Sequence, residues 1–306
     1  MKMPKVGVIG LAGQSAFLAA DHFPAPGETV KCTKLFFELG GKGYNQAVAC
    51  SHMGVPAVFI GAVGRDNNGK ACREELTREG VTPCLIVKEI PTAFAVITTD
   101  SSAENTVSVF PGAAKALTPK DLRSEEVMAQ LRECTYLLLQ NELSADCLAE
   151  ACRIGQELGI PVILNPAPAQ NIAPEVLRAC GLITPNYGEA KCLTGISERE
   201  QPTGRELADR FARQGIFNAV ITMGSQGAMV MERGKPRHIR AFSPAQPVDT
   251  TGAGDTFNGV LAAMLACEAD LFDAALTASI AAGISVTRPG AAGSIPTKAE
   301  VDACRW

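Results

Sequence analysis

A glycine-rich segment in the last third of the chain has the composition of a phosphoryl-transfer site. Residues 249–259 read DTTGAGDTFNG, with small residues at positions 252–254 directly before Asp255. Apolar residues then recur at helical spacing, at Phe257, Val260, Leu261, Met264 and Leu265. The small residues allow a tight turn with outward N–H groups, so the segment predicts an anion site at a helix N-terminus. Asp255 beside it could accept a proton from an alcohol that attacks an incoming phosphoryl group.

An alternative for Asp255 is that it only caps the predicted helix, because Asp is a common capping residue. The run Gly252-Ala253-Gly254 favours the anion site, since an ordinary cap does not need small residues before it. The segment therefore indicates an anion site with a carboxylate beside it, and the helix cap remains the competing interpretation.

A second glycine-rich turn, residues 40–47, reads GGKGYNQA and carries a cation, Lys42, into a predicted helix. Alone, this pattern is typical of a site for a phosphate or a hydroxyl-rich ligand, but also of a plain loop-to-helix junction. Residues 64–71, GRDNNGKA, match a P-loop up to the last position. Because Ala71 lacks the hydroxyl that would hold magnesium there, this third segment favours an ordinary strand-to-helix turn.

Patterns of buried strands alternate with amphipathic helical patterns along most of the chain. Apolar runs occupy residues 6–10, 58–63, 136–139, 161–164 and 219–222, and helical patterns occupy residues 145–158, 205–214, 255–267 and 271–286. This alternation predicts right-handed crossovers and a three-layer α/β/α core with a mainly parallel sheet, in one domain over residues 1–306. Residues 28–38 and 93–110 carry strand patterns without an intervening helix, which predicts a small antiparallel sheet outside the core.

Composition favours a small-molecule partner. The 306 residues include 28 Lys and Arg against 32 Asp and Glu, so a net charge of −4 gives no general attraction to nucleic acid or anionic lipid. The 11 cysteines are an odd number without a C-x-x-C pair, which favours neither a disulfide framework nor a zinc site. Residues 1–20 superficially resemble a signal peptide, but glycines interrupt the apolar run, and no apolar stretch reaches membrane-spanning length. The sequence predicts a cytoplasmic protein.

The two glycine-rich turns together resemble the signatures of the ribokinase-like (PfkB) family of carbohydrate kinases. Further segments match in the order of that family, at residues 23–30, 164–169, 184–189 and 221–227. The resemblance implies ATP-dependent phosphorylation of a hydroxyl of a sugar or sugar-like molecule, by direct in-line transfer. It also implies that the small sheet is a lid, formed by about residues 14–38 and 91–110. Two other functions stay open: a nucleoside kinase of the same fold, and a non-catalytic ligand-binding regulator.

The resemblance also implies roles for individual residues. Asp255 would be the general base, and the N–H groups of Gly252, Ala253 and Gly254 would stabilise the transferring phosphoryl group. The residues facing the sugar, besides Asp255, would be Gly13, Ser15, Gly40, Gly41, Lys42, Asn45 and Glu142. The nucleotide would be lined by Thr222, Gly224, Ser225 and Gly227. Asn186 and Glu189 would position Mg²⁺ and the phosphates through water, although Asn followed three residues later by Glu is also a common helix start.

A monovalent-cation site is implied as well. The matching positions are Asp249, Thr251, Ser285, Arg288, Gly290 and Ser294, which would act mainly through backbone carbonyls. A large, weakly hydrated ion such as K⁺ suits such ligands and could shape the neighbouring anion site.

One departure from the family pattern concerns the sugar. The first strand of the family leads into an N-x-D whose Asp binds two sugar hydroxyls, and the matching positions here are Gly13 and Ser15. A serine cannot replace the two charge-assisted hydrogen bonds of a carboxylate, so ribose specificity is not carried over.

The predicted lid also suggests self-association. Leu35, Phe36 and Phe37 place adjacent apolar side chains on both faces of one predicted strand. The sequence therefore predicts a homodimer through the lids, with packing of these residues on their own core as the alternative.

Overall fold

The computed structural model describes residues 2–102, 104–197 and 199–304, and its centre is a nine-stranded sheet. The strand order is β13-β12-β11-β10-β9-β8-β1-β4-β5, parallel from β11 to β5 and antiparallel at β12 and β13. The strands are β1 Val6–Ile9, β4 Ala57–Gly64, β5 Val81–Lys88, β8 Tyr136–Gln140, β9 Val162–Asn165, β10 Leu182–Ile183, β11 Ala219–Thr222, β12 Ala228–Glu232 and β13 Lys235–Ile239. The predicted mainly parallel α/β core is confirmed.

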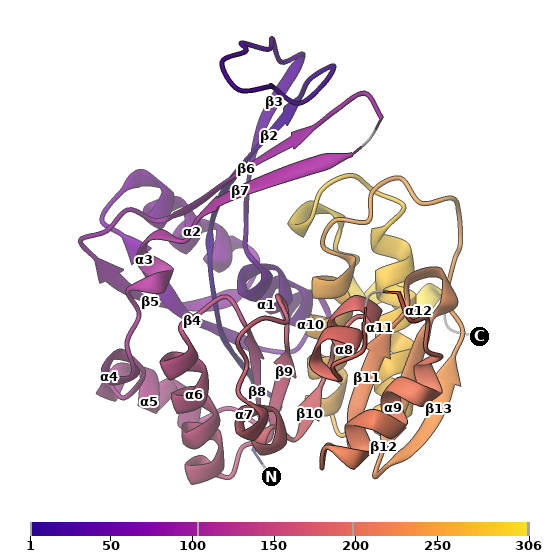
Figure 1. The fold of residues 1–306 in the computed structure, drawn as a ribbon. Helices are drawn as coiled ribbons and strands as arrows, with labels where there is room; N and C mark the ends of the chain where they lie inside the picture. Colours follow the sequence, from indigo (N-terminus) through magenta and orange to yellow (C-terminus); the bar gives the residue numbers. More distant parts are fainter. Residues whose placement is uncertain (1, 103, 198, 305–306) are drawn as a thin grey trace.

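Helices cover both faces of this sheet (Figure 1) and form two separate apolar clusters with it. One face carries α1 Lys42–His52, α2 Asn67–Arg78, α10 Ala253–Ala266, α11 Leu271–Ser285 and α12 Lys298–Ala303. The other carries α3 Gly112–Lys115, α4 Pro119–Leu122, α5 Glu125–Arg132, α6 Ala145–Leu158, α7 Pro174–Ala179, α8 Tyr187–Leu193 and α9 Gly204–Arg213. Two short 3₁₀ turns are η1 Gly224–Gln226 and η2 Ala292–Ser294. Over the described parts of the chain, no helix combines the length and apolar character needed to cross a bilayer.

Local side-chain chemistry sets where these helices begin and end. Ser144 caps α6 by accepting the N–H of Cys147 at 3.2 Å, and Gly159 ends that helix in the left-handed conformation with φ 65°. The segment that resembles a P-loop is a capped helix start, because Asp66 Oδ1 accepts the N–H of Gly69 at 2.8 Å. Both features follow from residues adjacent in the sequence.

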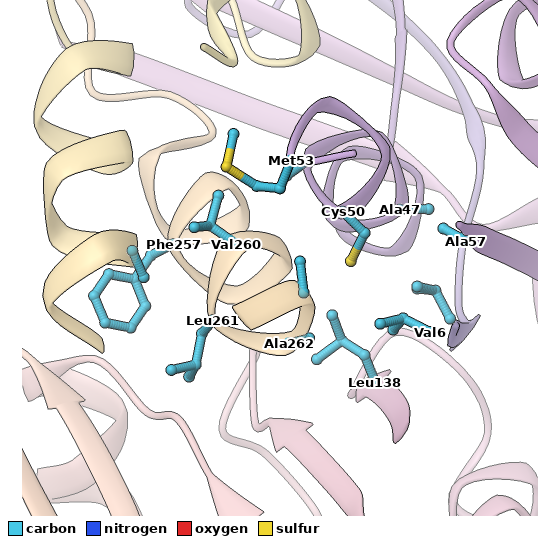
Figure 2. Packing of buried hydrophobic residues seen from close by; sticks show 14 of the residues in the cluster. Val6, Ala47, Cys50, Met53, Ala57, Leu138, Phe257, Val260, Leu261 and Ala262 are labelled. Carbon is cyan, nitrogen blue, oxygen red and sulfur yellow. The ribbon is translucent and has the colours of Figure 1, made fainter. Parts of the chain in front are cut away.

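Helices α1 and α10 approach each other closely at Gly259, which positions the functional site. A Cβ at Gly259 would lie 2.3 Å from the carbonyl oxygen of Gln46 and 2.5 Å from Cβ of Ala49, so only glycine allows this contact. Cys50 Sγ donates to the carbonyl of Gly259 at 3.1 Å. Figure 2 shows α1 residues such as Cys50 beside α10 residues such as Val260, which belong to one cluster of buried apolar side chains. The start of α10 is thereby brought next to the start of α1.

A second sheet of four strands projects from the carboxyl edge of the main sheet (Figure 1). Its strands are β2 Gly13–Ala19, β3 Lys34–Gly40, β6 Ala93–Thr99 and β7 Asn105–Phe110, in the order β3-β2-β6-β7. The prediction of an entirely antiparallel sheet is wrong, because β2 and β6 pair in parallel. Both strands leave the main sheet at its carboxyl edge, after β1 and β5, and therefore run outward together. Gly13 permits their close approach, since a Cβ there would lie 2.4 Å from the carbonyl oxygen of Ala93.

Candidate active site

A cavity lies between the small sheet and the N-termini of α1 and α10. Strands β2, β3, β6 and β7 contribute an apolar wall that includes Phe17, Ile97, Val107 and Val109. Every residue that the sequence analysis assigned to the sugar lines this one cavity: Gly13, Ser15, Gly40, Gly41, Lys42, Asn45, Glu142 and Asp255. The structure therefore brings together positions that are widely separated in the sequence.

Asp255 lies in the first turn of α10, with its carboxylate buried at the base of this cavity. Asn45 Nδ2 donates to Oδ2 at 2.9 Å, and Gln46 Nε2 donates to Oδ1 at 3.0 Å. Burial raises the pKa of the Asp255 carboxyl above its ordinary value, and the Lys42 ammonium and the two amides offset part of that effect. A carboxylate held by two donors and destabilised by burial is suited to accept a proton.

The amide of Gln46 is fixed at both ends. Its oxygen accepts from Gln140 Nε2 at 2.7 Å, and its nitrogen donates to Asn165 Oδ1 at 3.1 Å as well as to Asp255. Asn165 in turn donates to the carbonyl of Thr184 at 3.1 Å. The sequence analysis missed Gln46 and Gln140, although two signals were present: Gln46 follows Asn45 within the second glycine-rich turn, and Gln140 directly follows a buried apolar run.

Lys42 and Glu142 both line the cavity with Asp255 and influence its electrostatics. The backbone N–H of Lys42 donates to Glu142 Oε2 at 3.0 Å. Burial raises the pKa of Glu142 to about 7, and Asp255 adds to this effect while Lys42 opposes it. Burial alone would lower the pKa of Lys42, but attraction by Asp255, Glu142 and Glu189 outweighs it and raises the pKa. The Lys42 ammonium is thus stabilised in its charged form by several nearby carboxylates.

The turn before Asp255 has the geometry expected of an anion site. Gly252 adopts the left-handed conformation with φ 73°, and a Cβ there would lie 2.9 Å from Cα of Ala291. Helix α10 begins at Ala253, whose N–H donates to the carbonyl of Thr250 at 3.3 Å, whereas the N–H groups of Gly254 and Asp255 have no acceptor within the helix. Gly254 has open space where a side chain would be, since among the described residues nothing outside its own helix and chain neighbours lies within 4 Å of a Cβ built there. An anion can therefore approach these N–H groups.

Asn186 and Glu189 form the helix-capping pair that was the alternative interpretation. Asn186 Oδ1 accepts the N–H of Glu189 at 2.8 Å, and Glu189 Oε2 accepts the N–H of Asn186 at 2.8 Å. Burial raises the pKa of Glu189, partly offset by the Asn186 N–H and the Lys42 ammonium, and Asp255 raises it further. Capping does not use the second carboxylate oxygen of Glu189, and the carboxylate lies within electrostatic reach of Lys42 and Asp255.

The predicted nucleotide segment lies next to this capping pair. Thr222 ends β11 and forms an isolated parallel bridge with Asn186. Gly224 and Gly227 adopt positive φ values of 56° and 85° around exposed Ser225. A Cβ at Gly227 would lie 2.0 Å from the carbonyl oxygen of Ile239, so this turn requires glycine.

Two of the loops assigned to a monovalent cation are joined by one carboxylate. Asp249 Oδ1 accepts the N–H of Thr251 at 2.9 Å, and Oδ2 accepts the N–H of Gly290 at 2.9 Å. Burial would raise the pKa of Asp249, but these hydrogen bonds outweigh it and lower the pKa. The remaining positions use their side chains elsewhere: Ser285 and Ser294 donate to the carbonyls of Ala282 and Ala291, and Arg288 pairs with Glu300. The Arg288 side chain is positively charged, so that residue could serve a cation only through its backbone carbonyl, whereas the two serines also keep hydroxyl lone pairs.

Glu38, at the end of β3, was not singled out in the sequence and lines the same cavity. Its Oε1 accepts the N–H of Ala291 at 3.2 Å and the N–H of Gly293 at 3.3 Å. No local signal marks this residue, because its partners lie more than 250 residues away in the chain, at a separation of 253 for Ala291.

Comparisons with known proteins agree with this geometry. The model of the pfkB family carbohydrate kinases matches residues 3–298. A ribokinase of Haemophilus influenzae is 36% identical over 295 residues, covering 96% of this chain and 95% of that protein. The solved structure of ribokinase from Thermotoga maritima has a TM-score of 0.89 at 32% identity and covers 99% of each chain. A ribokinase of Arabidopsis thaliana, solved in complex with ribose and ATP, has a TM-score of 0.88 at 28% identity and covers 99% of this chain and 98% of its own.

Proposed function

This chain belongs to the pfkB family of carbohydrate kinases and phosphorylates a hydroxyl of a sugar or sugar-like molecule with ATP, and we propose that Asp255 is the general base of that reaction. The observation that carries the proposal is the position of its carboxylate, at the start of α10 and at the base of the cavity. A hydroxyl placed against Asp255 loses its proton to that carboxylate as its oxygen attacks the γ-phosphorus of ATP.

The turn at residues 252–254 supplies the electrostatic part of the same step. Negative charge on the transferring phosphoryl group is stabilised by the first N–H groups of α10, which are free of intrahelical partners. The Lys42 ammonium adds positive charge on the cavity side, and Glu142 keeps the N–H of Lys42 in place. Thr222, Gly224, Ser225 and Gly227 are proposed to line the nucleotide.

Magnesium and potassium are proposed as the metal ions. Asn186 and Glu189 offer hard oxygen ligands, and Glu189 would bind water molecules that coordinate Mg²⁺. When bound with ATP, Mg²⁺ would neutralise part of the phosphate charge. The two loops that Asp249 joins offer carbonyl oxygens with a single carboxylate, a donor set of low charge that fits a monovalent ion such as K⁺. A cation there would stiffen the turn that forms the anion site.

The substrate is proposed to be a sugar other than ribose, although relatives are ribokinases. Ser15 lines the cavity on β2 where a carboxylate would bind adjacent hydroxyls of ribose. An ATP-dependent reaction suits the cytoplasmic location that the sequence predicts.

A homodimer through the small sheets is proposed from the exposed apolar residues of those strands. Phe36, Val107 and Val109 are 52%, 56% and 58% exposed. The alternative that the apolar residues of β3 pack on their own core is not favoured, because Leu35 and Phe37 are 58% and 56% exposed. A second copy would cover this surface.

ATP consumption with a panel of sugars, polyols and nucleosides tests the proposed function. We expect at least one sugar to give ADP and a phosphorylated product with the wild type, and no product with Asp255→Asn. Turnover of nucleosides alone would overturn the sugar assignment. Product formation by Asp255→Asn at the wild-type rate would overturn the role of the base.

A further inference from the structure

Glu38 is placed to contact the substrate from the small sheet. It pairs directly with Ser15 across β2 and β3, and both residues line the cavity. Residues directly opposite in an antiparallel pair point to the same face, with Cβ atoms about 4.5–5.5 Å apart. The side chains of Glu38 and Ser15 therefore lie on the same, cavity-lining face of the small sheet, and the Glu38 carboxylate rests against the backbone of residues 291–293.

No other carboxylate reaches the cavity from this side, over the part of the chain that the structure describes. The remaining cavity residues on β2, β3, β6 and β7 are apolar, glycine, Gln14 or Ser15. The other acids of the cavity are outside the small sheet: Glu142 follows β8 and accepts the N–H of Lys42 at the start of α1, and Asp255 lies in the first turn of α10. A sugar in this cavity can therefore contact the reactive carboxylate and, from the small sheet, Glu38.

The present contacts of Glu38 leave capacity for a ligand. Oε1 accepts from Ala291 and Gly293, whereas Oε2 has one long contact, 3.4 Å from the N–H of Ala291. An ionised carboxylate has about four acceptor positions on its two oxygens. The backbone contacts hold the side chain in one orientation, and Oε2 remains able to accept from a hydroxyl.

Building on the proposed function, we propose that Glu38 is the specificity-determining carboxylate of this kinase: Oε2 accepts hydrogen bonds from hydroxyls of the sugar that face the small sheet, while Oε1 keeps the residue 291–293 backbone in place. Hydrogen bonds to a charged acceptor are stronger than those between neutral groups, so this contact contributes strongly to the choice of sugar. The ligand class is a polyhydroxylated sugar rather than a simple alcohol.

Glu38→Gln is the first test, because the amide keeps the size of the side chain and one acceptor oxygen for the backbone contacts. Steady-state kinetics with the sugar that the wild type turns over fastest should show a rise in sugar KM of about ten- to hundredfold. The KM for ATP should change less than twofold. Glu104→Gln is the matched control, since Glu104 is an exposed acid directly before β7 of the same sheet and does not line the cavity.

A double variant that moves the carboxylate from β3 to β2 separates substrate binding from the contact with the backbone of residues 291–293. In Ser15→Asp/Glu38→Gln, the new Asp side chain at position 15 restores a negative charge in the cavity. The carboxylate that contacts Ala291 and Gly293 is still absent. We expect this double variant to recover sugar kcat/KM at least tenfold over Glu38→Gln, and to change the rank order among ribose, 2-deoxyribose and the preferred sugar.

An unchanged sugar KM in Glu38→Gln would overturn the inference. So would a fall in kcat that is equal for every sugar and is not recovered in the double variant, because that result would assign Glu38 to the loop alone. A wild type inactive toward all sugars would instead overturn the proposed function, so the two failures are distinguishable.

Discussion

Gln46 Nε2 lies 3.0 Å from Asp255 Oδ1, and the amide that carries this nitrogen cannot reverse because Gln140 Nε2 donates to its oxygen at 2.7 Å. The proposed base therefore always faces a donor from Gln46. This donor stabilises the ionised carboxylate, which burial disfavours.

Replacing Gln46 with methionine removes that donor at similar volume. We expect the pKa of Asp255 to rise, so the acid limb of the kcat/KM–pH profile should move to higher pH while the high-pH plateau falls about tenfold or less. Gln140→Met leaves Gln46 able to reverse and should move the limb in the same direction by less. An unmoved limb in both variants would show that this amide does not tune the base.

Asp255→Asn tests the base itself. General-base removal typically lowers rate by about 10² to 10⁴, and we expect kcat to fall in that range. Stability should not fall, because the oxygen of Asn45 has no hydrogen-bond partner among the described residues, and its amide can turn to accept from the new amide. The measurements are single-turnover rate, ATP affinity and melting temperature; a near-wild-type rate would contradict the mechanism.

The pH dependence of kcat/KM should reflect the protonation of the two buried acids, Glu142 and Asp255. Activity requires ionised carboxylates, so kcat/KM should rise with pH, with an acid limb near 7, where the pKa of Glu142 lies, and with a contribution from Asp255, whose pKa is raised above its ordinary value by burial. Glu142→Gln removes one of these two acids and its repulsion of Asp255. Its limb should therefore begin at lower pH, at reduced maximal activity. A limb at the ordinary pKa of Asp in the wild type would contradict the burial argument.

Replacing sodium by potassium at fixed ionic strength should raise kcat severalfold. The reason is that carbonyl-rich loops joined by Asp249 suit a large ion and adjoin the turn that forms the anion site. Asp249→Ala breaks both hydrogen bonds and should abolish the difference between the salts. Equal rates of the wild type in the two salts would remove the cation site and leave the kinase assignment intact.

The small sheets should hold two copies together in solution. We expect a dimer mass by sedimentation at micromolar concentration, and a monomer for Val107→Glu, which places a charge on the exposed apolar face of the small sheet that also forms the cavity wall. Thr106→Glu is the matched control, because the adjacent residue points to the other face of β7 and is exposed. A monomeric wild type, or a dimeric Val107→Glu, would contradict this interface.

Local patterns were sufficient to predict the core and the two glycine-rich turns. Ala291 and Leu11 approach Gly252 and Gly41 so closely that a side chain would not fit at either position. The sequence meets this need with glycine at both. The start of α10 and the cavity residues of α1 followed from the same segments.

Register across distant strands could not be predicted in the same way. The parallel pairing of β2 with β6 depends on where two strands leave the main sheet, and the position of Glu38 depends on its pairing with Ser15. Gln140 was hidden for a related reason, since its partner Gln46 is 94 residues away. Such contacts are set by tertiary packing, which single-sequence periodicity does not contain.

The close contact at Gly259 also governs when the protein can become active during folding. Asn45 and Gln46 are 210 and 209 residues from Asp255 in the chain, and α1 can meet α10 only after the intervening strands have found their order. Contacts of such separation form late, because the chain must first lose the entropy of a very long loop. Neither half of the chain alone can assemble the carboxylate with its donors. Recovery of activity after denaturation therefore reports completion of the whole topology, not the formation of any one part.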